Sequence, residues 1–431
     1  MKKNFNIAIV GLGQIGCYLL NELNTKKKDI LIKTGKKINI VAISAKNKNK
    51  KRQFKINKKI FYTNPLKIVK EKKIDILIEA IGSSDGMSKK IVEIALKNKI
   101  HVVTPNKALI SKHGDYLAKL AEVNKVNLEF EASVGGGIPI LRTIKESLAT
   151  NKIKKVYGIL NGTCNYILSE MEETKDSFAN VLSRAQKLGY AEPVNPKLDL
   201  NGYDALAKIK ILSSLAFNNK ISKSINLMEG IENIENKDFE IVDQLNYRIK
   251  LLGITELINN QLFERVHPCL VKKNTYIGNV NGVMNAVILN GKPVGESVLQ
   301  GEGAGPGPTS SALISDLCSI LKGDISYPFG ISTLLRKKIS KFNISNHLCS
   351  SYFRIEAKDQ PGVLSSITKI FALNKISIKN LLQKPNKKNK KASIIIITHK
   401  NIEKNYQNLI SNLIKNKFVL KKPTFIRIEK V

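Results

Sequence analysis

Short apolar segments alternate with longer helical patterns over the first 133 residues of the chain. These segments are NIAIV (6–10), INIVAIS (38–44), IDILIEAIG (74–82), HVVT (101–104) and VNLEFEAS (126–133). They are rich in isoleucine and valine without strict alternation, which is typical of strands buried on both faces. Strands that alternate with helices form βαβ units, so we expect an α/β domain over residues 1–133 with a doubly wound parallel sheet.

The pattern changes after the glycine-rich segment SVGGGIP (133–139). Longer helical patterns follow at residues 165–175 and 204–217, and a strand-rich region covers residues 250–300. We expect a second, α+β domain over residues 134–320 that serves substrate binding and dimerisation. Residues 321–349 are interpreted as a closing helix and linker.

Residues 350–431 show a third pattern. A strand (350–357) precedes the turn KDQPG (358–362) and an amphipathic helix (363–374). Two strands (376–384 and 392–399), another helix and a last strand (424–430) complete the chain. This βαββαβ order predicts a small ferredoxin-like sandwich.

The formal net charge of +36 raises the question of a nucleic-acid or membrane partner. The lysines are spread over the whole sequence, and no helix-turn-helix, zinc-finger or RNA-binding aromatic motif accompanies them. No run of 18 or more apolar residues occurs. We therefore expect no nucleic-acid partner and no membrane, and we interpret the charge as a general attraction for anionic cofactors and substrates.

The five cysteines are widely separated, odd in number and without C-x-x-C spacing. They are Cys17, Cys164, Cys269, Cys318 and Cys349. Neither a disulfide framework nor a zinc site is indicated, so a reducing cytoplasm is the expected compartment.

A glycine motif follows the first predicted strand directly and opens a helix. IAIVGLGQIG contains G-x-G-x-x-G, formed by Gly11, Leu12, Gly13, Gln14, Ile15 and Gly16. In a Rossmann domain the first glycine allows the tight turn, the second lets a pyrophosphate approach and the third lets helix and strand pack. The strand, motif and helix in this order favour dinucleotide binding over a glycine turn without a ligand.

The end of the second predicted strand bears on the choice of cofactor. NAD sites usually have an acid there for the ribose 2′-hydroxyl, but this chain has Ser44, Ala45 and Lys46. A lysine could bind a 2′-phosphate, so NADP is favoured and NAD remains possible. The alternative is that Lys46 belongs to a solvated basic loop.

Two further motifs lie where the predicted sheet meets the second domain. HVVTPNKALI places Lys107 just past the fourth strand, at the carboxyl edge where ligands of doubly wound folds bind. EASVGGGIPI combines Glu131 with successive glycines, whose carbonyls could turn inward. One acid and several carbonyls suit a hard cation, although a plain domain hinge explains the glycines almost as well.

Together with GILNGTCNYILSEM, AQKLGYAEPVNPKLDLNGYDALAKIKIL, NVNGVMNAV and GEGAGPGPTSSALISDL, these motifs closely resemble homoserine dehydrogenase over residues 1–340. AKDQPGVLSSITKIFALNKISIKNLLQK resembles an ACT domain, an amino-acid-sensing module. No aspartate kinase segment precedes the dehydrogenase motifs, as in the monofunctional form. The resemblance implies reversible NAD(P)H-dependent reduction of L-aspartate 4-semialdehyde to L-homoserine, in threonine, methionine and isoleucine biosynthesis.

The same resemblance assigns site residues. Lys208 matches the acid/base lysine, and Lys107 matches the lysine near nicotinamide and substrate. The substrate acids match Glu192, Asp199 and Asp204, and the further cofactor contacts match Gly189 and Gly303. A monovalent cation site, usually for structural sodium, matches Glu131, Val134, Gly136 and Ile138.

Asp204 and Lys208 are four residues apart and share one helix face, where an exposed salt bridge would be the ordinary interpretation. A carboxylate neighbour raises the pKa of a lysine, whereas proton transfer near neutrality requires a lowered pKa. Desolvation of the lysine on domain closure, or use of Asp204 by the substrate amine, would resolve this conflict.

The chain departs from the family pattern at two places. Between Glu192 and Asp199 it is one residue longer, with Asn195 in place of an aspartate, while the spacing from Asp199 to Lys208 is kept. Cys164 replaces a common threonine in NGTCNY.

Three alternatives stay open from the sequence. Cys164 permits an aspartate-semialdehyde dehydrogenase, which works through a cysteine thioester. A non-catalytic ligand sensor is the second. In the ACT segment, DQPGVL could bind the carboxylate of an amino-acid effector, with threonine expected, or the segment could serve dimerisation alone. The expected assembly is a homodimer or homotetramer.

Overall fold

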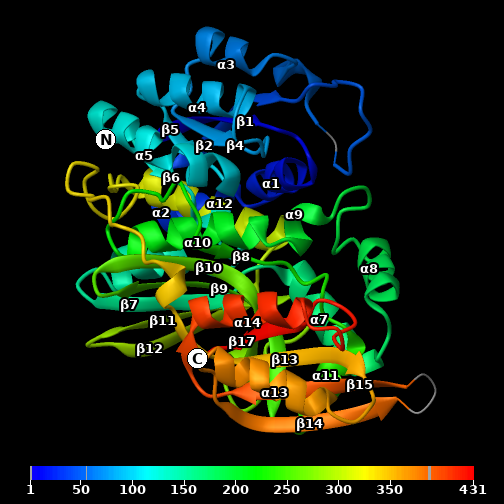
Figure 1. Cartoon of the computed structure of the whole chain (residues 1–431). Helices are drawn as coiled ribbons and strands as arrows, with labels where there is room; N and C mark the ends of the chain where they lie inside the picture. The colour runs from blue at the N-terminus through cyan, green and yellow to red at the C-terminus, as the bar shows by residue number, and fades with distance from the viewer. Residues whose placement is uncertain (1, 55, 387–389) are drawn as a thin grey trace.

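The first part of the chain forms a parallel sheet with helices on both faces (Figure 1). The computed structural model describes residues 2–54, 56–386 and 390–431. The sheet order is β3-β2-β1-β4-β5-β6, with strands β1 (Asn4–Val10), β2 (Lys37–Ser44), β3 (Phe61–Tyr62), β4 (Ile76–Glu79), β5 (His101–Val103) and β6 (Leu128–Glu129). The helices are α1 (Gln14–Thr25), α2 (Lys27–Thr34), α3 (Pro65–Glu71), α4 (Met87–Lys97) and α5 (Lys107–Asn124). This arrangement confirms the predicted Rossmann-type sheet. From β1 the chain adds strands β2 and β3 on one side, and from β4 it adds β5 and β6 on the other. Doubly wound folds bind their ligands at this switch point between β1 and β4.

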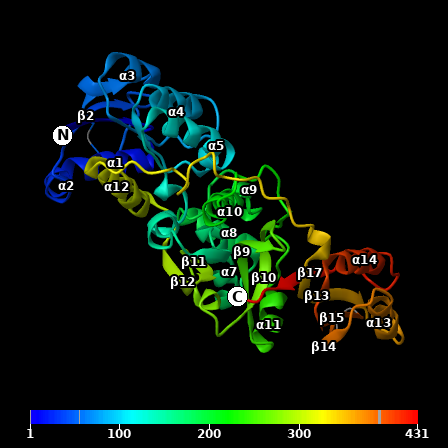
Figure 2. The ribbon, with the colours of Figure 1, turned by 90° about the vertical axis from the view of Figure 1, so that its left-hand side faces the viewer.

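A helix from much later in the chain completes this part of the structure. Helix α12 (Pro306–Lys322) lies beside α1, as Figure 2 shows. Its buried residues Leu313, Leu317 and Leu321 belong to one hydrophobic cluster with Ile7 and Ile9 of β1. The chain therefore returns to the first sheet after passing through the second one.

The second part is built on a mixed sheet covered by helices on one face. Its strands are β7 (Lys152–Ile159), β8 (Leu227–Met228), β9 (Tyr247–Ile258), β10 (Gln261–Lys272), β11 (Met284–Lys292) and β12 (Gly295–Glu302). Its helices are α6 (Ile140–Arg142), α7 (Gly162–Thr174), α8 (Phe178–Lys187), α9 (Lys197–Leu200), α10 (Tyr203–Ala216) and α11 (Asn236–Gln244). Helices α7 and α10 pack on β7 and β9, so the predicted helical and strand-rich regions are confirmed.

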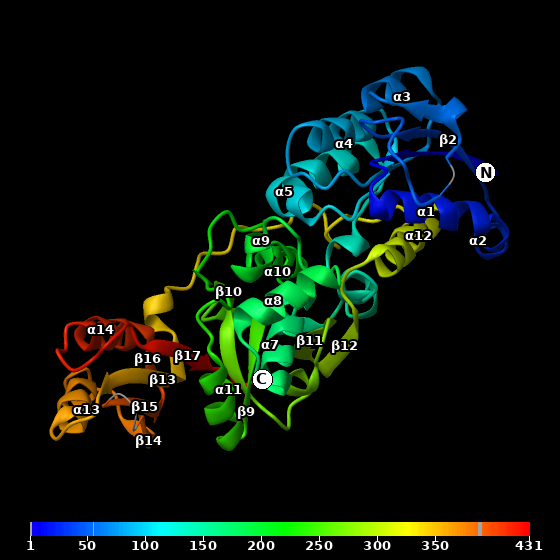
Figure 3. The same ribbon diagram turned by 90° about the vertical axis from the view of Figure 1, so that its right-hand side faces the viewer.

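The third part has the predicted βαββαβ topology, with one additional two-residue strand, β16, before its second helix. It contains β13 (Leu348–Lys358), α13 (Val363–Leu373), β14 (Ile378–Asn386), β15 (Lys391–Thr398), β16 (Asn401–Ile402), α14 (Glu403–Ile414) and β17 (Thr424–Ile428). Strand β17 pairs with β10 in parallel, so the sheets of the second and third parts are continuous in the order β12-β11-β7-β9-β10-β17-β13-β15-β14. The three parts lie in a row with the first and third at opposite ends (Figure 3).

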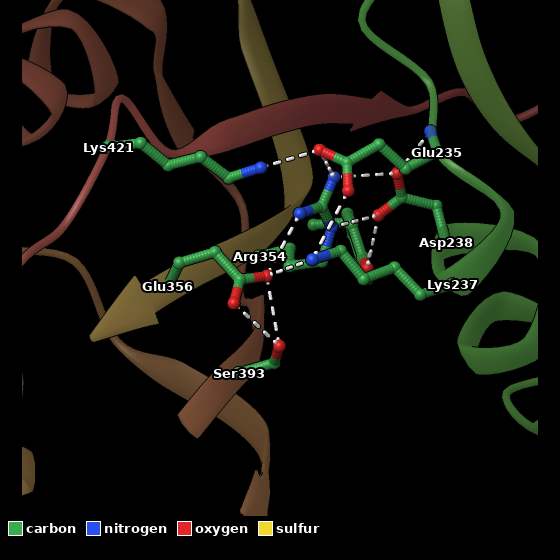
Figure 4. Close-up of polar contacts among 8 residues, drawn as sticks. Glu235, Lys237, Asp238, Arg354, Glu356, Ser393 and Lys421 are labelled. Atoms are coloured by element: carbon green, nitrogen blue, oxygen red, sulfur yellow. Dashed lines mark hydrogen bonds and ion pairs between the residues drawn. The ribbon is translucent and has the colours of Figure 1, made fainter. Parts of the chain in front are cut away.

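A buried polar network joins the third part to helix α11 (Figure 4). Arg354 on β13 donates to both carboxylate oxygens of Asp238, at 2.6 and 3.0 Å, and both side chains are fully buried. The network also contains Tyr352, which donates to Asp238, and Glu356, which pairs with Lys237. Removal of one partner of such a buried pair would leave an uncompensated charge, which is strongly destabilising.

Among the described residues, no helix is long and apolar enough to cross a membrane. All five cysteines are free thiols.

Candidate active site

The glycine turn after β1 has the three properties that a dinucleotide site needs. Gly11 has φ +100°, and a Cβ there would lie 2.3 Å from the carbonyl oxygen of Ala80. A Cβ on Gly16 would lie 1.9 Å from the carbonyl oxygen of Gly11, so helix and turn pack without room for a side chain. Around Gly13, in contrast, a Cβ would meet no atom within 4 Å. The turn is closed on its protein side and open at Gly13, which fits a pyrophosphate at the N-terminus of α1.

A cleft of about 520 Å³ lies between this turn and the second sheet. Residues of α1, α5, α7, α10 and the start of α12 line it. Of the predicted residues, the lining contains Ile15, Lys107, Gly189, Asp199, Asp204, Lys208 and Gly303. Residues that are distant in the sequence therefore meet at the carboxyl edge of the first sheet, beyond β1, β5 and β6.

Lys107 is the first residue of α5, and its position follows from the cap of that helix. The side chain of Asn106 accepts a hydrogen bond from the amide of Leu109 at 3.0 Å and donates to the carbonyl of Ser83 at 2.8 Å. A capping residue bonded on both sides fixes the start of the helix. The cap thereby directs Lys107 across the cleft.

Asp204 lies between two lysines at the centre of the cleft. Its Oδ1 is 2.9 Å from Nζ of Lys107, and its Oδ2 is 2.9 Å from Nζ of Lys208. Lys208 is buried and donates in addition to the carbonyl of Leu160 at 2.6 Å. The Asp204–Lys208 pair is therefore not the exposed salt bridge that spacing alone suggested.

Asn161, which no sequence motif singled out as a site residue, bonds to both acids. It caps α7 by accepting from the amide of Cys164 at 2.8 Å. Its Nδ2 donates to Asp199 at 2.8 Å and to Asp204 at 2.9 Å. Asn161 lies in the motif NGTCNY, so its position near the site could have been expected from the sequence. Its hydrogen bonds to the two acids could not, because they depend on how α9 and α10 pack against the start of α7.

The environment separates the pKa values of these groups. Burial lowers the pKa of Lys208 and outweighs the opposing effect of Asp204. Asp204 raises the pKa of Lys107. Burial disfavours the charged form of Asp204, yet Lys208 and Lys107 together hold its pKa below the usual range, whereas burial raises the pKa of Asp199. Of the two expected ways to lower the Lys208 pKa, desolvation is thus already present in the folded chain.

The other predicted residues do not line the cleft, and two of them, Glu192 and Lys46, lie exposed on loops. Glu192 is exposed on the loop after α8, and its backbone carbonyl accepts a hydrogen bond from Gln186. Lys46 is exposed in the loop after β2. In that loop Arg52, which the sequence did not single out, turns back to the glycine motif and donates to the carbonyls of Asn47 at 2.7 Å and Leu12 at 3.4 Å.

Cys164 is buried, and its thiol donates to the carbonyl of Asp199 at 3.3 Å. Burial raises the pKa of the Cys164 thiol well above its ordinary value, so the thiolate needed for a thioester mechanism is strongly disfavoured. The site therefore argues against the cysteine-dependent alternative.

Cys164→Ser is expected to keep kcat within about threefold of the wild-type value, because a small polar side chain replaces a thiol that is not ionised. Steady-state kinetics of the purified variant measure this. Loss of all turnover in a folded C164S protein would restore the cysteine mechanism.

The glycine turn at the switch point, facing a buried lysine and two carboxylates, defines an NAD(P)-dependent oxidoreductase. Family models agree: one for the NAD-binding domain of homoserine dehydrogenase matches residues 11–131, one for homoserine dehydrogenase matches residues 139–318, and one for the ACT domain matches residues 351–417. The chain belongs to the homoserine dehydrogenase family.

Individual relatives cover the whole chain. It is 38% identical to homoserine dehydrogenase of Neisseria gonorrhoeae, over 99% of each chain. It is likewise 38% identical to that of Helicobacter pylori, over 100% of each. The solved structure of a homoserine dehydrogenase from Thiobacillus denitrificans superposes with a TM-score of 0.91 at 35% identity, covering 99% of each chain.

Proposed function

We propose that the enzyme catalyses the reversible NAD(P)H-dependent reduction of L-aspartate 4-semialdehyde to L-homoserine, a step of threonine, methionine and isoleucine biosynthesis. The observation that carries the proposal is the Lys107–Asp204–Lys208 centre on the cleft that the glycine turn borders. A bound nicotinamide supplies the hydride to the aldehyde carbon and accepts it in the reverse direction. The residues of the chain then have two tasks, which are to transfer one proton and to bind the substrate ammonium group.

Lys208 carries the proton. In the reductive direction its ammonium donates a proton to the oxygen that gains charge as the aldehyde carbon is reduced. In the oxidative direction its neutral amine removes the proton of the homoserine hydroxyl. A pKa lowered by burial increases the neutral fraction at a given pH, which suits the second role.

The acids of the cleft bind the substrate ammonium. Asp204 is already paired with the ammonium groups of Lys107 and Lys208, which leaves Asp199 for the substrate ammonium and gives a further carboxylate beside it a role. Glu192, on the exposed loop next to the cleft residues Gly189 and Tyr190, supplies it when that loop moves inward. This assignment of Glu192 stays a prediction.

The assay for this function is homoserine-dependent reduction of NADP, followed spectrophotometrically. Absence of turnover in pure, folded protein with either NADP or NAD would contradict the proposal and favour a ligand-sensing protein.

NADP is the proposed cofactor, with NAD as the alternative. No acid ends β2, and the guanidinium of Arg52 lies at Leu12 of the glycine turn, close to Lys46 and Asn47 in the same loop. A fixed guanidinium is a strong phosphate ligand, and lysines of the loop add charge.

Arg52→Ala is expected to raise the KM for NADP by about tenfold or more while changing the KM for NAD little, because a hydrogen bond to a charged group contributes about 1.5–3 kcal/mol. Lys46→Ala serves as the comparison, with a smaller loss expected for a solvated lysine. Equal losses with both cofactors in R52A would remove Arg52 from 2′-phosphate recognition.

A structural monovalent cation, with sodium expected, belongs to the same proposal. Its ligands would be Glu131 and the carbonyls of Val134, Gly136 and Ile138. Within the described residues, no hydrogen bond of the chain reaches the buried carbonyls of Val134 and Gly136, and a hard cation would compensate such oxygens. The Glu131 carboxylate accepts the amides of Leu141 and Arg142 at 2.8 Å each and retains further lone pairs.

An amino-acid effector acting through the ACT domain, with threonine expected, completes the proposal together with a homodimeric or homotetrameric assembly. The ACT match at residues 351–417 supports an amino-acid effector. The free cysteines support a cytoplasmic location.

A further inference from the structure

The ACT domain touches the catalytic part of the chain through a buried arginine. Arg427 on β17 is 1% exposed and forms two hydrogen bonds to Glu403 of α14, at 3.0 and 2.5 Å. Its third bond, at 2.8 Å, goes to Glu229, which lies outside the ACT domain. Arg427 therefore ties the last ACT strand to the segment that follows β8.

The segment 229–231 in turn supports helix α9. The amide of Glu229 donates to Val266 of β10 at 2.8 Å, and the amide of Ile231 donates to the carbonyl of Leu200 at 3.1 Å. Between them, a Cβ on Gly230 would lie 2.3 Å from that same carbonyl oxygen. The segment is thus held against the end of α9 with no spare space.

Leu200 follows Asp199, the acid at the edge of the cleft. Asp199 and Asp204 share the amide of Asn161 at 2.8 and 2.9 Å, so a shift of α9 would separate Asp199 from that donor. The complete connection from Arg427 to Asp199 consists of one ion pair, a tightly packed backbone segment and one backbone hydrogen bond.

We propose that Glu229 and Arg427 are positioning residues for the substrate-binding acid Asp199, and that the last strand of the ACT domain thereby supports the homoserine end of the cleft. The inference rests on the proposed function, which assigns Asp199 to the substrate. The glycine turn precedes α1 and Lys208 lies on α10, whereas Asp199 lies on α9. Loss of this support should therefore raise the KM for homoserine before it lowers kcat.

The chain offers a matched pair of variants to test this. Glu229→Gln removes the negative charge of one partner of Arg427, which keeps Glu403, and Glu256→Gln does the same to one partner of Arg265, which keeps Glu429 at 3.0 and 3.1 Å. Each change replaces a charge-assisted hydrogen bond by a weaker neutral one. Both acids bind a buried arginine at this junction, at 2.8 and 2.7 Å, but Glu256 lies on β9, away from α9.

E229Q is expected to raise the KM for homoserine by about three- to tenfold, with kcat and the KM for NADP unchanged within about twofold. E256Q should leave all three parameters near the wild-type values, with a similar melting temperature for both variants. Gly230→Ala, which presses on the Leu200 carbonyl, should reproduce the E229Q pattern. Equal kinetics of E229Q and E256Q in an active enzyme would overturn the inference.

Hydrogen exchange over residues 197–204 gives a second readout that needs no turnover. Faster exchange is expected in E229Q and not in E256Q, and identical exchange would contradict the inference. An inactive wild-type protein would contradict the proposed function alone, because the exchange comparison still tests the support of α9.

Discussion

Lys208→Ala is expected to reduce kcat for homoserine oxidation by about 10²–10⁴-fold, the usual contribution of a positioned acid or base. The expectation follows from geometry: Lys208 is buried on the cleft, held at 2.6 Å from the Leu160 carbonyl and at 2.9 Å from Asp204. In the variant the buried amine that would accept the hydroxyl proton is absent, and Lys107 cannot replace it readily because its pairing with Asp204 raises the Lys107 pKa.

The role of Lys208 as acid or base predicts opposite pH dependences for the two directions of the reaction. Homoserine oxidation requires neutral Lys208, so its kcat should rise as pH increases through the Lys208 pKa, which burial lowers. The reduction of the semialdehyde requires the protonated form and should fall over the same range. In K208A both dependences should disappear.

Lys210→Ala is the control for Lys208, because it lies one residue beyond Ile209 on the same helix and outside the residues that line the cleft. K210A should keep most of the turnover. If K208A retained near-normal kcat while remaining folded, Lys208 would be only a structural partner of Asp204.

Arg354→Leu should destabilise the junction between the ACT domain and α11 by about 3–5 kcal/mol, the usual cost of breaking a buried ion pair. The variant removes the guanidinium that pairs with Asp238 (Figure 4). It leaves this carboxylate buried, with Tyr352 as a remaining donor at 2.9 Å. Hydrogen exchange in β13, β15 and α11 measures this cost locally, which is preferable to a single unfolding free energy in a chain of several domains.

A double variant separates charge burial from packing at this junction. Arg354→Leu combined with Asp238→Asn should cost less than the sum of the two single changes, because no uncompensated charge remains. Lys421→Ala, which removes a half-exposed partner of Glu235 in the same network, should cost no more than about 1 kcal/mol. If the free-energy costs of Arg354→Leu and Asp238→Asn were strictly additive, Arg354 would contribute through packing alone.

The support of α9 by the ACT strand also affects how regulation can be studied. Removing residues 350–431 would take away Arg427 and expose the edge of β10, which pairs with β17. A truncated enzyme would thus lose the support of Asp199 as well as any effector site, so point variants at Glu229 separate the two effects better.

Sequence patterns predicted the first sheet, the glycine turn and the ACT topology because these depend on local rules. Strand periodicity, a helix start and the need for glycine at Gly11 and Gly16 are properties of short segments. The lysines and acids were found through motifs, and Asp199, Asp204, Lys107 and Lys208 do meet in one cleft.

The sequence by itself determined the elements and the chemical groups, whereas tertiary structure decided how those groups behave. The Asp204–Lys208 spacing is compatible with an exposed salt bridge, and only burial by surrounding elements lowers the Lys208 pKa. The contacts of Asn161 with two acids, of Arg52 with the glycine turn and of Arg427 with Glu229 each join residues distant in the chain. Desolvation and long-range hydrogen bonds depend on how separate elements pack, and no local pattern encodes that packing.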